Sequence, residues 1–314
     1  MARCQVIEMY FESWQAIVFM GSQAMKHSIR RVSPVPQWPT YRGVSHYLGA
    51  SPTTQVSVYV DPSLGAAAFQ NGTDLVNDAD RVVKINNALF ATPSQPVNVI
   101  IFALGSKTDG TGGADHNSCD YTKGGDIEVC ASFGNSSRVS ALFEAEISEC
   151  SMGGNLCGVS SGEALSRWCA LVVSNNALAD FATAPAWMQR GMPDFVNKTD
   201  GTDQNEISTG CGMAFLSWLQ QLGHALNVIA PAMVALGSSA TLAQLYAKLT
   251  SGTASDAWPK FLAAVKLLPQ ITNDDPFGKS SIAGREVMST VHLHRTRMAS
   301  KARGGGKSVR IRKR

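Results

Sequence analysis

The stretch Ser137-Arg-Val-Ser-Ala-Leu-Phe-Glu-Ala-Glu-Ile-Ser-Glu-Cys-Ser-Met152, which two glycines follow, decides the fold. Five of its apolar residues recur at helical spacing and predict one buried stripe: Val139, Leu142, Phe143, Ile147 and Cys150. At about 100° per residue, Glu146 falls inside this stripe, Glu149 on its margin, and Glu144 on the opposite face, which we expect to be exposed. A carboxylate directed at a core costs several kcal/mol unless it is paired, protonated or bound to metal, so Glu146 needs a partner.

The sequence before this helix predicts a small sheet. Residues 55–60 alternate with period two, which predicts a strand, and residues 73–90 predict a one-sided helix with the first residue as its N-cap. Residues 96–104 are apolar on both faces, as in the central strand of a sheet. This order of strand, helix and strand favours a parallel pair. Residues 126–133 predict a further short strand, after which Asn135 is placed to cap the quoted helix.

After the quoted helix the chain is mainly helical. The predicted helices cover residues 160–173, 211–222, 225–236, 242–249 and 256–268, and a long loop covers 182–206. We therefore expect an α+β fold, in which a small mixed sheet packs against the glutamate-bearing helix and a mainly helical C-terminal half. The predicted parts are an irregular N-terminal arm, a single domain and a disordered basic tail, over residues 1–51, 52–278 and 279–314.

Charge is distributed unevenly along the 314 residues. The segment from residue 279 onward holds 11 of the 27 basic residues and one of the 24 acidic ones, which leaves 16 basic and 23 acidic residues before it. An acidic body argues against a surface for nucleic acid there. Hydrophobic residues make up 44% of the chain and charged residues 16%, so the body can bury a sizeable core.

The number and spacing of the cysteines indicate the cellular compartment of the protein. Six of the seven fall between residues 119 and 211, without a Cys-x-x-Cys pair, and predict up to three disulfides in a secreted or periplasmic protein. One disulfide could join Cys119 to Cys130, and the alternative is that the cysteines are reduced and buried. Residues 15–20 are a poor signal peptide, because acids precede the apolar run, and they are too short to span a membrane. We expect no transmembrane segment.

The order of elements resembles the zincin fold of metallopeptidases, in which a helix with the motif His-Glu-x-x-His lies under a short sheet and binds zinc. The corresponding stretch is Ala145-Glu-Ile-Ser-Glu149, where Glu146 matches the general base, and Ala145 and Glu149 replace both histidines. In the gluzincin branch a glutamate of the next helix completes the site, and Glu163 in Gly-Glu-Ala-Leu-Ser-Arg167 matches it. Residues 114–121, 143–150, 162–167 and 210–215 also resemble an uncharacterised family of bacterial secreted proteins.

The candidate site residues are carboxylates and their neighbours. Glu146 and Glu149 are the candidate catalytic residues, and the candidate binding residues are Asp115, His116, Asp120, Glu163 and Arg167. Neither histidine of the body, His116 or His224, lies on the glutamate-bearing helix, which argues against zinc. The carboxylates suit a hard divalent cation instead, namely calcium, magnesium or manganese.

Structural roles compete with these functions. Ser160 and Glu163 fit a capping box, and Glu163 with Arg167 fits an i,i+4 ion pair. For Glu146 the favoured partner is a buried arginine, either Arg138 or Arg167. The resulting hypothesis is a zincin-like protein without the zinc site, which has no cofactor and acts by binding a protein or glycan surface rather than by catalysis. The alternatives are a hydrolase with an atypical carboxylate site, with a hard metal or none, and a structural surface protein.

Overall fold

The computed structural model describes residues 35–93, 95–120 and 125–278. The predicted arm up to residue 34, with its apolar run, and the basic tail from residue 279 lie outside the described residues. The chain divides into two units, residues 1–36 and 37–314, and all elements below belong to the second. None of the helices in the described part is both long enough and apolar enough to cross a membrane.

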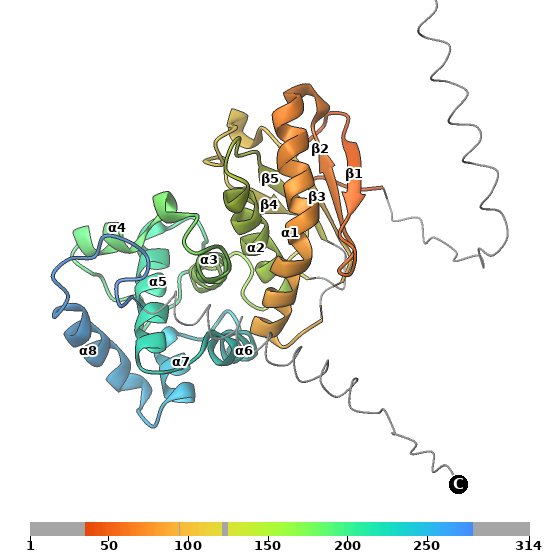
Figure 1. The fold of residues 1–314 in the computed structure, drawn as a ribbon. Helices are drawn as coiled ribbons and strands as arrows, with labels where there is room; N and C mark the ends of the chain where they lie inside the picture. The colour runs from red at the N-terminus through yellow and green to blue at the C-terminus, as the bar shows by residue number, and fades with distance from the viewer. Residues whose placement is uncertain (1–34, 94, 121–124, 279–314) are drawn as a thin grey trace, which may run out of the picture. The chain divides into compact units, whose positions relative to one another are not determined.

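A five-stranded mixed sheet forms the first part of this unit (Figure 1). Its strands are, in chain order, β1 (His46–Ala50), β2 (Val56–Val60), β3 (Val97–Phe102), β4 (Ala114–His116) and β5 (Gly125–Cys130). Their spatial order is β1-β2-β3-β5-β4, with β2, β3 and β5 parallel and both edge strands antiparallel to their neighbours. All six residues of β3 are buried, so the predicted central strand and parallel pair are confirmed.

Two helices pack on this sheet, and further helices stack behind them (Figure 1). α1 (Ala66–Phe90) contacts β1 and β2, whereas α2 (Ser136–Ser151) contacts β5 and β4. α3 (Ser160–Ser174) packs against α2, and α5 (Glu206–Gln221) packs against α3. The remaining helices are α4 (Ala184–Gln189), α6 (Leu226–Leu236), α7 (Leu242–Leu249) and α8 (Ala254–Val265). The predicted α+β class with a mainly helical C-terminal half is confirmed.

The register of β4 directs His116 at α2. In the antiparallel pair of β4 and β5, His116 lies opposite Ile127, and Asp115 lies opposite Glu128. Neighbouring residues of a strand point to opposite faces of the sheet. Ile127 belongs to the hydrophobic core, whereas the Glu128 carboxylate accepts hydrogen bonds from the backbone of residues 40–41. His116 therefore shares the face of Ile127, on which α2 packs.

Several local details differ from the sequence-based predictions. Residues 46–50, which we expected in an irregular arm, form β1, and a bulge between Tyr47 and Gly49 breaks the period-two pattern that would have revealed the strand. Helix α1 begins at Ala66, so Thr73 is not its N-cap and instead donates its hydroxyl to the Phe69 carbonyl at 2.9 Å. The run of alanines before Thr73 favours the longer helix.

Two further predictions concern the C-terminal half. The capping box at α3 is wrong, because no side chain caps this helix and the Ser160 hydroxyl donates to the Thr202 carbonyl at 2.6 Å. The expected loop over 182–206 contains the short helix α4. The predicted cap of α2 is confirmed, since the Asn135 side chain accepts from the Arg138 amide at 3.2 Å.

Candidate functional site

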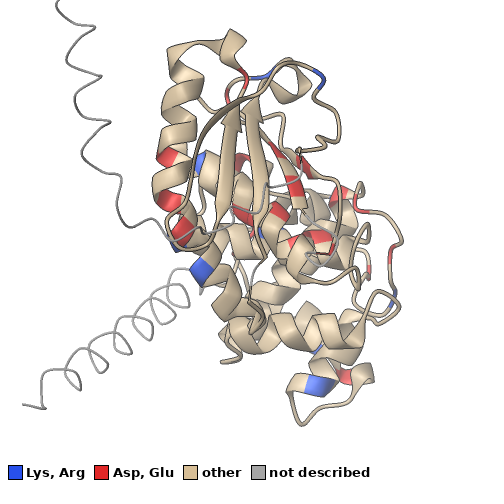
Figure 2. Cartoon of the chain, turned by 90° about the vertical axis from the view of Figure 1, so that its right-hand side faces the viewer, with Lys and Arg blue, Asp and Glu red and all other residues tan. Residues whose placement is uncertain are grey.

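A cleft of about 790 Å³ lies between the edge strand β4 and helices α2 and α3. Its acidic lining residues are Asp115, Glu146, Glu149, Glu163, Asp180, Asp203 and Glu206. Arg167 and His116 are the basic residues of the lining. In Figure 2, red acidic segments gather where the strands meet the helices, with few blue basic segments among them. The cleft therefore has a strongly negative character.

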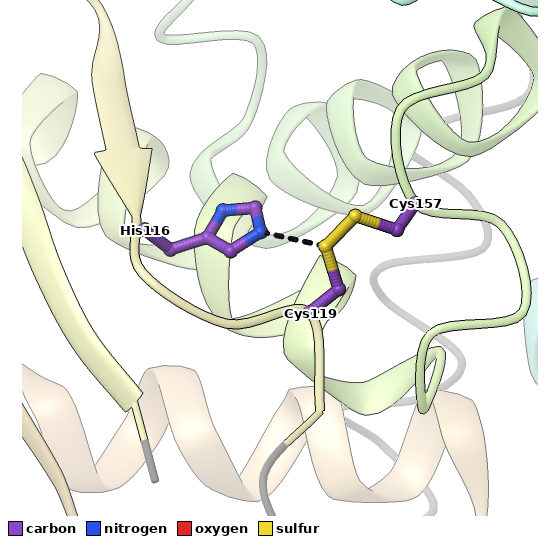
Figure 3. A group of neighbouring side chains, drawn as sticks. All are labelled: His116, Cys119 and Cys157. Atoms are coloured by element: carbon purple, nitrogen blue, oxygen red, sulfur yellow. Dashed lines mark hydrogen bonds between the residues drawn. A yellow bond between two sulfur atoms is a disulfide. The ribbon is translucent and has the colours of Figure 1, made fainter. Parts of the chain in front are cut away.

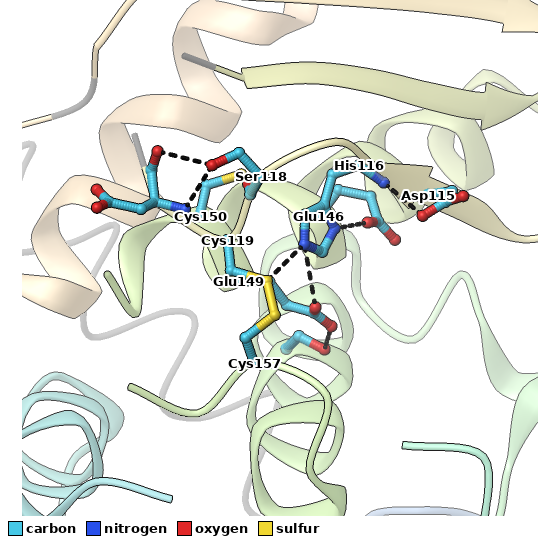
Figure 4. Close-up of a disulfide and its surroundings, with 10 residues drawn as sticks. Asp115, His116, Ser118, Cys119, Glu146, Glu149, Cys150 and Cys157 are labelled. Carbon is cyan, nitrogen blue, oxygen red and sulfur yellow. Dashed lines mark hydrogen bonds and ion pairs between the residues drawn. A yellow bond between two sulfur atoms is a disulfide. The ribbon is translucent and has the colours of Figure 1, made fainter. Parts of the chain in front are cut away.

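His116 and Glu146 form the central contact of the cleft (Figure 4). The ring atom Nδ1 lies 2.6 Å from Glu146 Oε2, and the two side chains are 11% and 12% exposed. On the other side of the ring, Nε2 lies 3.2 Å from Cys119 Sγ and 3.8 Å from Glu149 Oε2. Burial favours the neutral ring, but the hydrogen bond to Glu146 and the surrounding carboxylates outweigh it and raise the pKa of His116 to about 9. The imidazole is therefore protonated at neutral pH.

The predicted arginine partner of Glu146 is wrong. Arg138 forms an ion pair with Asp180, and Arg167 forms the predicted i,i+4 pair with Glu163 at 3.4 Å. Both arginines are therefore engaged elsewhere. The actual partner comes from β4, thirty residues before Glu146, and only the pairing of β4 with β5 brings it to α2.

The other two glutamates of the predicted site also line the cleft. Glu149 accepts a hydrogen bond from the Ser166 hydroxyl at 3.0 Å. Burial is the main reason why the pKa of Glu149 rises to about 8, and the neighbouring charges of Glu146 and Glu163 add to it. Burial also raises the pKa of Glu163. At neutral pH the cleft floor thus holds a largely protonated carboxyl group beside an ion pair.

The remaining predicted residues divide into two groups. Asp115 lines the cleft at the edge strand, where its carboxylate accepts from the His116 amide at 2.8 Å. Asp120 is not among the lining residues. The potential ligand atoms that lie within 4.8 Å of one another belong to His116, Cys119 and Cys157 (Figure 3). Within the described residues, no group of three or more carboxylates alone reaches this closeness.

The cysteines form one disulfide in the described part of the chain, between Cys119 and Cys157 (Figure 4). The predicted bridge from Cys119 to Cys130 is wrong, because the register places Cys130 next to Gly113, at the opposite end of the β4–β5 pair. Four cysteines are buried free thiols, as the alternative prediction had it: Cys130, Cys150, Cys169 and Cys211. The disulfide joins the segment after β4 to the loop between α2 and α3.

Glu144 was expected on an exposed face of α2, and this prediction is wrong. The side chain is 0% exposed, and neither carboxyl oxygen has a hydrogen-bond partner among the described residues. Glu144 interacts with Arg81 of α1 and with Cys169 of α3, and the periodicity of one helix cannot reveal such neighbours. Burial raises the pKa of Glu144 well above its ordinary value, against an opposing effect of Arg81 on α1.

Sequence reasoning missed several residues of the cleft. Asp180 lies after α3, and Asp203, Glu206 and Thr209 lie around the start of α5, where no local pattern marks them. The contact of His116 with Cys119 did have a signal, because the two residues are spaced as His-x-x-Cys.

No protein-family model matches the chain, and no curated protein shows significant similarity to it. The function therefore has to be inferred from the cleft itself. Its distinguishing features are the excess of acidic side chains, the position of β4 at the edge of the sheet and the disulfide beside His116.

Proposed function

We propose that the protein is a non-catalytic binding protein with a zincin-like layout, whose cleft takes up an extended, positively charged polypeptide segment. The carrying observation is that seven acidic residues line a cleft that also borders the outer edge of β4. Acidic residues outnumber the two basic ones, His116 and Arg167, in this lining, and such an excess of one charge concentrates ligands of the opposite sign. The Cys119–Cys157 disulfide supports an oxidising compartment, as for secreted or periplasmic proteins.

The edge strand supports the extended conformation of the ligand. β4 is the last strand of the sheet, and its outer side pairs with no other strand of the described chain. Gly113 and Asn117 bond to β5, so by alternation the backbone groups of Ala114 and His116 point outward. Extended peptides commonly bind by adding a strand to such an edge. The His116 amide now donates to the Asp115 carboxylate. A ligand strand that displaces this carboxylate would accept the hydrogen bond of the amide instead.

The contacts of the glutamates support binding without catalysis. Glu146 is engaged by His116, Glu149 by Ser166, and Glu163 by Arg167. A general base must instead reach a proton of the substrate or of water. Carboxyl groups that are each held by a protein partner are better suited to maintain the shape of the cleft than to act on a substrate.

Two short labelled peptides test this proposal, one alternating Lys with Val and one alternating Glu with Val. We expect the basic peptide to bind at least about tenfold more tightly at low salt, with a difference that shrinks as salt screens the charges. The double variant Asp203→Asn/Glu206→Gln should lose most of this preference, whereas Asp256→Asn on α8, outside the cleft, should keep it. Equal affinity for both peptides, measured by fluorescence polarisation, would refute the proposal.

Hydrolysis is a second candidate function, and one observation favours it. On the floor of the cleft, Glu149 Oε2 lies 3.8 Å from His116 Nε2, and the raised pKa of Glu149, about 8, keeps a proton on this carboxyl group near neutral pH, as a general acid requires. Mass spectrometry of the same peptides after long incubation separates the two functions. Intact peptides support binding alone, whereas cleavage that is lost in Glu146→Gln would establish the hydrolase.

A further inference from the structure

We propose that reduction of the Cys119–Cys157 disulfide creates a site for one thiophilic divalent cation, such as zinc, in which His116 joins the two thiolates and Glu149 is the fourth ligand. The three potential ligand atoms of His116, Cys119 and Cys157 lie within 4.8 Å of one another (Figure 3). This inference goes beyond the binding function proposed above, because it does not depend on what occupies the cleft.

The distances from His116 fit a tetrahedral ion, whereas Glu149 lies outside the group of three mutually close ligand atoms and has to move toward the sulfurs. Bonds of about 2.3 Å to sulfur and about 2.0–2.1 Å to nitrogen and oxygen place the ligand atoms of tetrahedral zinc roughly 3.4–3.8 Å apart. His116 Nε2 lies 3.2 Å from Cys119 Sγ and 3.8 Å from Glu149 Oε2, close to this spacing. The two sulfurs of a disulfide, about 2.0 Å apart, need to separate by less than about 2 Å.

Glu146 orients the imidazole for this role. Its carboxylate holds Nδ1 of His116 at 2.6 Å, which leaves Nε2 directed at Cys119 and Glu149 (Figure 4). Histidines that bind metals usually donate their second ring N–H to a carboxylate in this way, which fixes the tautomer and makes the ligand more basic. Glu146 is thus a positioning residue of the proposed site.

The surrounding backbone allows the change. Cys157 is exposed, so a reductant can reach the disulfide. Gly154 and Gly158 flank Cys157 with positive φ values of 80° and 70°, and no atom lies within 4 Å of where a Cβ would stand on either, so the loop has room to adjust. The Gly154 amide donates to the Cys119 carbonyl at 2.8 Å, a contact that keeps the two segments together without the disulfide.

The proposed site forms in two steps, reduction of the disulfide and binding of the cation. The reduction adds two electrons and two protons to the disulfide, so that the Cys119–Cys157 bond breaks and two thiols form on the protein; a dithiol reductant becomes a disulfide, and a phosphine takes up the oxygen of water and becomes a phosphine oxide. The cation then binds both sulfurs as thiolates and displaces their two protons. His116 binds through Nε2 after losing the proton from that atom, and the Glu149 carboxyl group loses its proton to solvent when it binds.

Cobalt(II) titration of the full chain tests the proposal, because thiolate ligands give sulfur-to-cobalt charge-transfer bands. We expect the chain reduced by a water-soluble phosphine, in anaerobic buffer, to bind one cobalt per chain with these bands and to exchange it for zinc. The oxidised chain should bind at least about 100-fold more weakly. Equal binding before and after reduction, or no stoichiometric binding after it, would overturn the proposal.

Variants identify the ligands. Cys157→Ser should abolish the charge-transfer bands or reduce them by about half, and His116→Gln should weaken binding by about 10–100-fold. Glu146→Gln should weaken binding by a similar factor while the bands persist, with partial rescue in Glu146→Asp. His224→Gln, on a histidine outside the cleft, is the matched control and should bind as the original chain does. If the reduced chain unfolds, added zinc must restore its circular dichroism; failure to do so also refutes the site.

Discussion

Helix α2 buries glutamate side chains on two sides, and the two sides differ in the partners that they offer to the carboxyl group. On the side that faces Arg81 of α1, Glu144 is fully buried, and its oxygens have no hydrogen-bond partner in the part of the chain that the structure describes. On the cleft side, Glu146 and Glu149 are also largely buried, yet His116 and Ser166 contact them. A buried carboxyl group without a partner is tolerated mainly in its neutral form, whereas a partnered one can stay charged. Burial alone therefore does not mark a functional glutamate; its partners do.

The largest expected change in the free energy of unfolding concerns the packed side of α2, which faces the core. Phe143 is fully buried in the core, and Phe143→Ala should lower the free energy of unfolding by about 3–5 kcal/mol. Glu149→Gln on the cleft side should change it by less than about 1 kcal/mol, because the amide resembles the largely protonated carboxyl. Urea denaturation measures both. Equal losses would contradict the distinction between a packed side and a cleft side.

A disulfide stabilises the fold beside the cleft. The Cys119–Cys157 disulfide closes a loop with a sequence separation of 38. In metal-free buffer, Cys119→Ser/Cys157→Ser should therefore lower the free energy of unfolding by about 2–4 kcal/mol. Thermal unfolding of the variant against the oxidised chain gives this difference, and Cys130→Ser, at a free thiol, serves as the control for the substitution itself. An unchanged melting temperature in the double variant would show that packing alone holds these segments together.

The pH dependence of Glu144 tests whether the packed side holds a neutral carboxyl. Its pKa in the folded chain is raised, so this group's contribution to stability is full below the ordinary pKa and is lost as pH rises toward the folded pKa. Glu144→Gln should remove this loss. The stability of the variant relative to the original chain should grow between pH 5 and pH 8 by up to about 1.4 kcal/mol per pH unit. Parallel pH profiles would instead show that Arg81 keeps Glu144 charged.

The smallest expected effect concerns the partner of Glu149. Ser166→Ala removes one hydrogen bond to this carboxyl and should cost about 0.5–1.5 kcal/mol of stability. Calorimetry of the variant at pH 7 measures it. A loss above about 3 kcal/mol would mean that the cleft side depends on its polar contacts as strongly as the packed side depends on its core.

The fold was largely predictable because its elements have strong local patterns. The apolar run over residues 97–102 and the stripe around Phe143 follow from period and burial. The site was predictable only in part. The position of Glu146 in an apolar stripe marked it as a site residue. Its contact with His116, however, depends on the register of β4, and the place of Asp203 in the cleft depends on the path of a loop far along the chain from α2. Such contacts arise between elements, and no period within one element encodes them.

The position of the disulfide in the chain has a consequence for biosynthesis. The loop that it closes contains β5 and α2, and it needs nothing beyond Cys157. A chain that emerges with its N-terminus first can therefore form this bond before α3 and the helices after it are available. Cys169 and Cys211 follow later in the chain and end as buried thiols. Early closure would protect this pair from exchange with these two later cysteines, whereas Cys130 and Cys150 are synthesised before Cys157 and are kept apart from Cys119 by their burial in the fold.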